Sequence, residues 1–170
     1  MPNLPTEEVY TLPDKDKTQG SVTATRPRSY SGTLIENFTL TFSEGNVVNF
    51  SAQKGEDTLR NILETDENAK RLGEIALVPH QTPISQSGLV FLNALYDENA
   101  SNHLALGSAY RYTLKDGEGM SDKDFAQAGG NDSLTHVDLM FGSGEMDVDG
   151  LLADGTSEPV MRKGEWAFDV

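Results

Sequence analysis

The stretch FTLTFSEGNVVNFSA, residues 38–52, decides the fold class. Apolar side chains occupy alternate positions on both sides of a central EGN turn: Phe38, Leu40, Phe42, Val48, Phe50 and Ala52. Side chains two apart share one face of a strand, so each half of this stretch can bury one face. A glycine beside polar residues between two such runs is typical of a hairpin turn. We therefore predict antiparallel sheet over the wider segment 21–55.

The period of the apolar residues then changes from that of a strand to that of a helix. An apolar stripe runs along EDTLRNILETDENAKRLG and consists of Leu59, Ile62, Leu63 and Leu72. This pattern predicts the main helix over about 55–73, with Gly73 as a suitable C-cap. The following segment EIALVPH, residues 74–80, suits a short buried strand that ends before a proline.

Short elements fill the rest of the chain. Residues 87–100 suit a helix, or a strand running into one, and residues 103–114 suit a strand. Ser121 is a good N-cap for a short helix over 121–129. The remaining predicted elements are a strand in HVDLMFG (136–142) and hairpin strands in 146–155 and 159–170. The fold class is therefore α+β: a β-rich domain of mostly antiparallel twisted sheet, with one main helix and two or three short helices.

Composition narrows the function classes. The 170 residues suit one domain with a core of its own. Asp and Glu total 27 against 13 Lys and Arg, and the resulting net charge of -14 disfavours binding to the phosphates of nucleic acid. No apolar run approaches the roughly 20 residues of a membrane helix, and the start, MPNLPTEEVY, does not have the pattern of a signal peptide. The lack of cysteine fits a reducing compartment. We expect a cytoplasmic protein that binds neither nucleic acid nor membrane.

The motif THVDLMFG, residues 135–142, raises a question of chemistry. His136 and Asp138 are two apart in a predicted strand, so their side chains share one face. Such a pair can hydrogen-bond to each other at a half-solvated sheet surface, or it can bind one metal ion. Spacing alone favours the hydrogen-bonded pair.

Other polar residues lie at the boundaries of apolar segments. Glu74 opens a buried strand, where an unpaired carboxylate would cost several kcal/mol, so it needs a cation, hydrogen-bond donors or solvent. His103 lies where a polar loop meets an apolar run, a position that suits the edge of a site. Glu98 suits either a site or the exposed end of a helix. His80, in VPHQ, suits an exposed loop.

Two further patterns have ordinary interpretations. Tyr110 and Tyr112 alternate in SAYRYTL, and strand tyrosines mostly serve packing. DVDG at 147–150 lacks the spacing of a calcium loop and suits a hairpin turn. Histidine and carboxylate ligands without sulfur nevertheless suit Zn, Mn or Co, and a tyrosine hydroxyl nearby can donate to an oxyanion. These patterns alone leave a two-metal site as one hypothesis among several.

Longer stretches resemble the C-terminal half of the metallo-aminopeptidases of the aminopeptidase T, aminopeptidase S and PepS type, the thermophilic metalloprotease family. They are NLPTEEVYTLPDKD (3–16), GTLIENFTLTF (32–42), TDENAKRLGEIALVPHQTPIS (65–85), LYDENASNHLALGSAY (95–110), NDSLTHVDLMFGS (131–143) and MDVDGLLADG through RKGEWAF (146–168). Their order and spacing extend the resemblance over nearly the whole chain.

The resemblance implies a metal-dependent aminopeptidase that removes the N-terminal residue from peptides with a free N-terminus, with two divalent ions (Zn, Co or Mn) as cofactors. The family's metal ligands fall on Glu8, Glu74, Glu98, His103, His136 and Asp138. A water activated by the two metals would attack the first peptide carbonyl. Glu74 would bridge the ions or take the proton from that water, and Tyr110 would be a ligand or an oxyanion donor, so these two are the expected catalytic residues. His80 falls outside the ligand set.

Family members carry an additional N-terminal domain that this sequence does not match. The resemblance therefore implies that residues 1–170 are a metal-binding catalytic domain, the C-terminal part of a two-domain enzyme. Glu8 would lie near a chain end, where order requires an anchor, and we expect the isolated domain to fold but to hydrolyse peptides poorly. The family also implies a homodimer. The alternatives are a non-catalytic dimerisation or metal-binding fragment and a structural β domain without metal.

Overall fold

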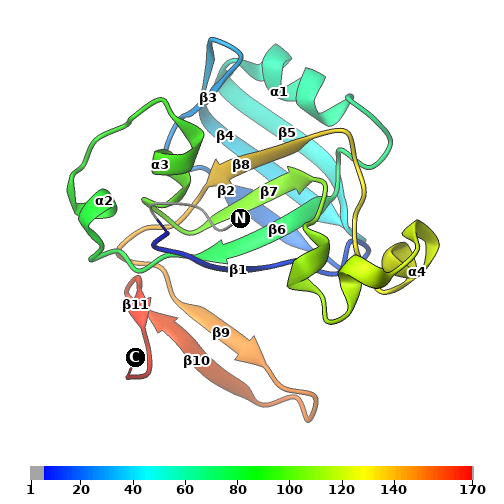
Figure 1. Ribbon diagram of the computed structural model, residues 1–170. Helices are drawn as coiled ribbons and strands as arrows, with labels where there is room; N and C mark the ends of the chain where they lie inside the picture. Colours follow the sequence, from blue (N-terminus) through cyan, green and yellow to red (C-terminus); the bar gives the residue numbers. More distant parts are fainter. Residues whose placement is uncertain (1–5, 170) are drawn as a thin grey trace.

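The computed structural model describes residues 6–169 (Figure 1). Its strands are β1 (Val9–Thr11), β2 (Gly20–Thr23), β3 (Arg28–Tyr30), β4 (Thr33–Ser43), β5 (Asn46–Lys54), β6 (Leu72–Leu77), β7 (His103–Gly107), β8 (His136–Met140), β9 (Val148–Leu151), β10 (Ser157–Arg162) and β11 (Glu165–Trp166). Its helices are α1 (Glu56–Leu63), α2 (Pro83–Gln86), α3 (Ala94–Glu98) and α4 (Asp122–Gln127), with short 3-10 turns at Arg111–Thr113 and Gly117–Gly119. The predicted α+β class, with one main helix and shorter ones, is confirmed.

The strands form three antiparallel groups. One sheet has the order β1-β6-β7-β8, a second is built around β4 with β2, β3 and β5 as its partners, and the third has the order β11-β10-β9. Figure 1 shows the first sheet lying across the second, with α1 beside β4 and β5, while the β9–β10 hairpin stands away from both.

The main core lies between the first two sheets and α1. It includes Phe38, Leu40 and Phe42 from β4, Leu59, Ile62 and Leu63 from α1, and Leu104, Leu106, Val137 and Leu139 from β7 and β8. Because side chains alternate along a strand, the opposite face of β7 and β8 carries His103, His136 and Asp138. Because the leucines and Val137 of β7 and β8 face the core, the three polar side chains must lie together on the opposite face of the sheet.

The predicted main helix is present but ends early. Helix α1 stops at Leu63 rather than at 73, because the Asp66 carboxylate accepts backbone N–H groups from Asn68 (2.8 Å) and Leu134 (2.6 Å). An Asp that satisfies nearby backbone donors in this way favours a turn over a continuing helix. Gly73 is consequently not a C-cap and lies inside β6, which was predicted to begin at Glu74.

Several smaller predictions need correction. Val48 was predicted to face the core, but it is 61% exposed. A bulge in the β4–β5 pairing places Val47, not Val48, opposite Phe42. Residues 87–93 contain no helix, and the helix predicted over 87–100 is confined to α3. The strand predicted over 103–114 ends at Gly107.

The C-terminal hairpin was predicted, but its turn was misplaced. DVDG at 147–150 is not a turn, because Asp149 and Gly150 pair with Pro159 and Glu158 within the β9–β10 ladder. The turn follows at 152–156, where the Leu152 N–H donates to the Thr156 carbonyl at 2.8 Å. Among residues 6–169, no helix is long and apolar enough to cross a membrane.

Candidate metal centre

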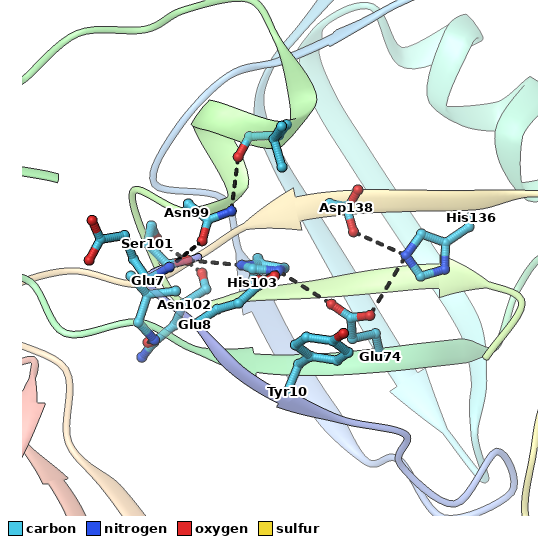
Figure 2. A network of polar contacts seen from close by, with 12 residues as sticks. Glu7, Glu8, Tyr10, Glu74, Asn99, Ser101, Asn102, His103, His136 and Asp138 are labelled. Carbon is cyan, nitrogen blue, oxygen red and sulfur yellow. Dashed lines mark hydrogen bonds and ion pairs between the residues drawn. The ribbon is translucent and has the colours of Figure 1, made fainter. Parts of the chain in front are cut away.

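The face of the first sheet that points away from the core carries the polar residues of the predicted site (Figure 2). His136 and Asp138 share this face of β8, with His136 Nε2 3.3 Å from Asp138 Oδ1. Their shared face, predicted from spacing, is therefore confirmed. Asp138 is almost completely buried, so this is not a pair on a half-solvated surface.

Glu74 reaches this face because of an irregularity in β6. Strict alternation would place Glu74 on the same face as Leu72, which belongs to the core. Instead the chain steps two residues from Leu72 to Glu74 while its partner β7 steps only one, from Leu106 to Ala105. The extra residue is Gly73, and this β-bulge turns the carboxylate from the core side to the site side.

Gly73 also permits a close approach by another segment. A Cβ at this position would lie 2.2 Å from the Ser108 carbonyl oxygen, so a side chain cannot be accommodated without movement. The same carbonyl accepts a hydrogen bond from His136 Nδ1 at 2.7 Å. Gly73 therefore has two effects: it turns the Glu74 side chain toward the site, and it leaves room for the Ser108 carbonyl that orients His136.

Figure 2 shows Glu74 between the two imidazoles. Its Oε1 lies 3.4 Å from His103 Nε2, and its Oε2 lies 3.8 Å from His136 Nε2. Glu8, from the segment just before β1, places its Oε2 3.0 Å from His103 Nε2, and its side chain is 1% exposed. Glu8 is thus anchored in the site despite its position early in the chain.

Backbone carbonyls fix the protonation of both rings. His103 Nδ1 lies 3.0 Å from the Ser101 carbonyl oxygen, and His136 Nδ1 has the Ser108 carbonyl as its partner. A carbonyl oxygen only accepts, so each Nδ1 carries a hydrogen and each Nε2 faces the carboxylates. An Nε2 lone pair against carboxylate oxygens is repulsive, so each Nε2 must hold either a proton or a cation.

The electrostatics of the pocket show the same need for positive charge. Burial alone would lower the pKa of His103, but hydrogen bonds to Glu74 and Glu8 outweigh it and raise the pKa to about 10. Burial likewise opposes the effect of Asp138 on His136, whose pKa rises to about 9. Burial, and after it the Asp138 carboxylate, raises the pKa of Glu98 to about 8.

Tyrosines form one wall of the site. Tyr110 lies just after β7, where its ring is 4.7 Å from that of His136 and stacks on Tyr112 at 5.4 Å. The Tyr112 and Tyr10 hydroxyls are 3.0 Å apart. Tyr110 and Tyr112 belong to an irregular segment and a 3-10 turn, not to the predicted strand.

These side chains surround a cavity of about 190 Å³ that opens to solvent. Its lining residues are Glu8, Tyr10, Glu74, Glu98, Tyr110, Tyr112, His136 and Asp138, with His103 buried beneath. Two groups of side chains could each hold a metal ion here, because the candidate ligand atoms within each group lie within 4.8 Å of one another. One group is Glu8, Glu74 and His103, and the other is Glu74, His136 and Asp138. Carboxylate oxygens and imidazole nitrogens at such spacing fit divalent cations.

The structure thus brings together every residue of the predicted site, although Glu98 lines the cavity without belonging to either group. His80 lies elsewhere, as expected, but it is half-buried rather than exposed, with Nδ1 3.3 Å from Ser85 Oγ. A larger cavity of about 350 Å³ borders His80 and contains none of the predicted site residues. Tyr10 was missed, although it lies two residues after Glu8, and side chains two apart share one face wherever the chain is extended.

The fold and the site together indicate a class: an α+β protein with two groups of side chains that could hold a divalent metal ion beside its first sheet. The family model described as "Thermophilic metalloprotease (M29)" matches residues 1–166, and the chain belongs to this family.

Known proteins agree with this assignment. Aminopeptidase AmpS of Bacillus subtilis (strain 168) is 55% identical over 99% of the chain, and aminopeptidase T of Thermus thermophilus is 53% identical over 97%. The solved structure of wild-type AmpT from Thermus thermophilus superposes with a TM-score of 0.92, at 52% identity over 98% of the chain. The chain spans about two fifths of the length of these relatives, namely 41% of AmpS and 40% of aminopeptidase T.

Proposed function

We propose that this chain supplies the metal centre of an aminopeptidase that hydrolyses the first peptide bond of its substrate with two divalent ions. The proposal rests mainly on the position of Glu74. Its two oxygens face different imidazoles, and it belongs to both groups of candidate ligands. One carboxylate shared between two ligand groups is the arrangement that a pair of ions requires. The relatives are named as aminopeptidases, which supports the reaction class.

Each part of the site has a role in this proposal. Glu8 and His103 would hold one ion, His136 and Asp138 the other, and Glu74 both, with Glu98 completing the ligand set. When bound, such ions lower the pKa of water and polarise a carbonyl group. The Ser101 and Ser108 carbonyls keep the two imidazoles in the tautomer that can ligate a metal.

Tyr110 is suited to donate a hydrogen bond to the developing oxyanion. Burial, and after it the carboxylates of Asp138, Glu74 and Glu98, raises its pKa to about 12, so the hydroxyl keeps its proton at neutral pH. Its ring is held by Tyr112 on one side and approaches His136 on the other. The donor is therefore positioned before substrate arrives.

The side chains that line the cavity support a proposed preference for free N-termini. Four carboxylates border about 190 Å³: Glu8, Glu74, Glu98 and Asp138. In the metal-loaded site a free α-amine would bind to an ion or to one of these carboxylates, whereas an acetylated nitrogen has neither a basic lone pair nor a charge. The cavity is also small enough to admit the end of a chain more readily than its middle.

The test compares a peptide having a free N-terminus with its N-acetylated form, using the metal-free chain to which Zn, Co or Mn has been restored. We expect release of the first residue from the free peptide alone, and a rate at least about tenfold lower for His136→Ala. Leu134→Ala is the matched control, because this side chain is 86% exposed two residues away. Equal cleavage of both peptides, or equal rates for His136→Ala and the wild type, would contradict the proposal.

A further inference from the structure

Three consecutive side chains at the end of α3 are buried and bind three different parts of the chain. The Asp97 carboxylate accepts the backbone N–H groups of Phe91 (2.8 Å) and Asn93 (3.0 Å), closing the loop before the helix. Glu98 points into the metal centre. Asn99 contacts the segment that carries Glu8, so this short helix joins two ligand-bearing parts of the chain.

The Asn99 side chain uses both ends of its amide. Its Oδ1 accepts the Glu7 N–H at 2.7 Å, and its Nδ2 donates to the Leu95 carbonyl within α3 at 2.9 Å. The residue is fully buried, at 0% exposure. Figure 2 shows Asn99 between α3 and the Glu7–Glu8 segment that precedes β1.

The Glu7–Glu8 segment needs this kind of support. Its ladder to β6 begins only at Val9, which pairs with Leu77. Glu8 nevertheless places its carboxylate 3.0 Å from the buried His103, where a shift of one ångström would change the ligand geometry. A buried amide that clamps the preceding N–H limits such a shift.

We infer that Asn99 is a positioning residue for the first ligand group, holding Glu8 in place beside His103 by fixing the Glu7 backbone to α3. The inference rests on the proposed metal centre for its functional meaning. Residues that orient metal ligands in this way typically alter metal affinity roughly 10–100-fold when they are removed. Asn99 itself touches neither metal nor substrate in this account.

The experiment compares Asn99→Ala with Asn131→Ala in the full chain. Asn131 is also 0% exposed, and its Nδ2 donates to the Asn68 (2.9 Å) and Gly107 (2.6 Å) carbonyls, far from Glu7. Both variants lose a buried amide and two hydrogen bonds. Hydrogen–deuterium exchange of residues 6–11 is measured without metal, and Zn affinity is measured by calorimetry.

We expect Asn99→Ala to speed exchange over residues 6–11 and to weaken Zn binding roughly 10–100-fold, whereas Asn131→Ala leaves exchange over residues 6–11 near wild type. Asn99→Leu removes both hydrogen bonds while nearly keeping the volume of the side chain, which provides a second variant if Asn99→Ala fails to fold. Equal exchange over residues 6–11 in the Asn99 and Asn131 variants would overturn the inference. A wild-type chain that binds no Zn would refute the proposed function, and exchange over 6–11 would still decide the role of Asn99.

Discussion

Replacing Gly73 with alanine tests whether the bulge in β6 builds the metal centre. The new Cβ would lie 2.2 Å from the Ser108 carbonyl oxygen and 2.5 Å from that of Gly107. Ordinary contact begins near 3.4 Å, so β6 and the Ser108 segment must separate by about 1.2 Å. Two proposed ligands are affected at once, because Glu74 follows the bulge and His136 depends on the Ser108 carbonyl.

The expected size of the effect follows from this displacement. Overpacking of a tight site costs about 1–3 kcal/mol, which corresponds to a fall in Tm of roughly 2–12 °C for a domain of this size. Displacing the hydrogen-bond partner of a ligating histidine should weaken Zn binding roughly 10–100-fold. Both quantities can be measured on the same samples, by calorimetric melting and by Zn titration.

Gly119→Ala is the matched control for this substitution. A Cβ there meets nothing within 4 Å, and Gly119 does not adopt a positive φ. We expect its stability to stay within about 0.5 kcal/mol of wild type and its Zn affinity to be unchanged. A Gly73→Ala protein with wild-type Tm and wild-type Zn affinity would show that the bulge does not position the ligands.

Three further predictions concern the site itself. Tyr110→Phe should leave metal binding intact and lower kcat by about 10²–10³ in the peptide assay, and an unchanged kcat would remove Tyr110 from the reaction. Glu74→Gln should weaken the binding of both ions in a Zn titration; loss of one ion alone would mean that Glu74 is not shared. At pH 7 the raised pKa values of His103, His136 and Glu98 mean that metal must displace a proton from each of them, so the affinity of each ion should fall at least about tenfold per unit as pH falls from 8 to 6. Titrations in buffers of different ionisation enthalpy would count these protons, and a pH-independent affinity would contradict the assigned charges.

Local periodicity was enough to predict the hairpin of β4 and β5 and the shared face of His136 and Asp138. These features depend on alternation within one strand, which the sequence displays directly. The ligand set as a whole came from resemblance to a family, because residues as distant as Glu8 and His136 meet only after four strands have paired. Spacing alone would have left His136 and Asp138 as an ordinary hydrogen-bonded pair.

The side of the sheet on which Glu74 lies could not be predicted from alternation. Counting from Leu72 places Glu74 in the core, and only the pairing with β7 shows that Gly73 is an extra residue. The same glycine resembled a helix C-cap, because the sequence does not reveal that the Asp66 side chain draws the chain into a turn. Asn99 was also missed, since its bond to Glu7 crosses 92 positions of sequence.

The central claim is that residues of this chain hold two divalent ions through a shared Glu74. Its most direct test is a calorimetric titration of Zn into chelator-stripped protein, beside the His136→Ala variant. The wild type should bind close to two equivalents and the variant about one, because the group of Glu8, Glu74 and His103 remains. A wild-type stoichiometry of one or zero, or a variant that still binds two equivalents, would contradict it.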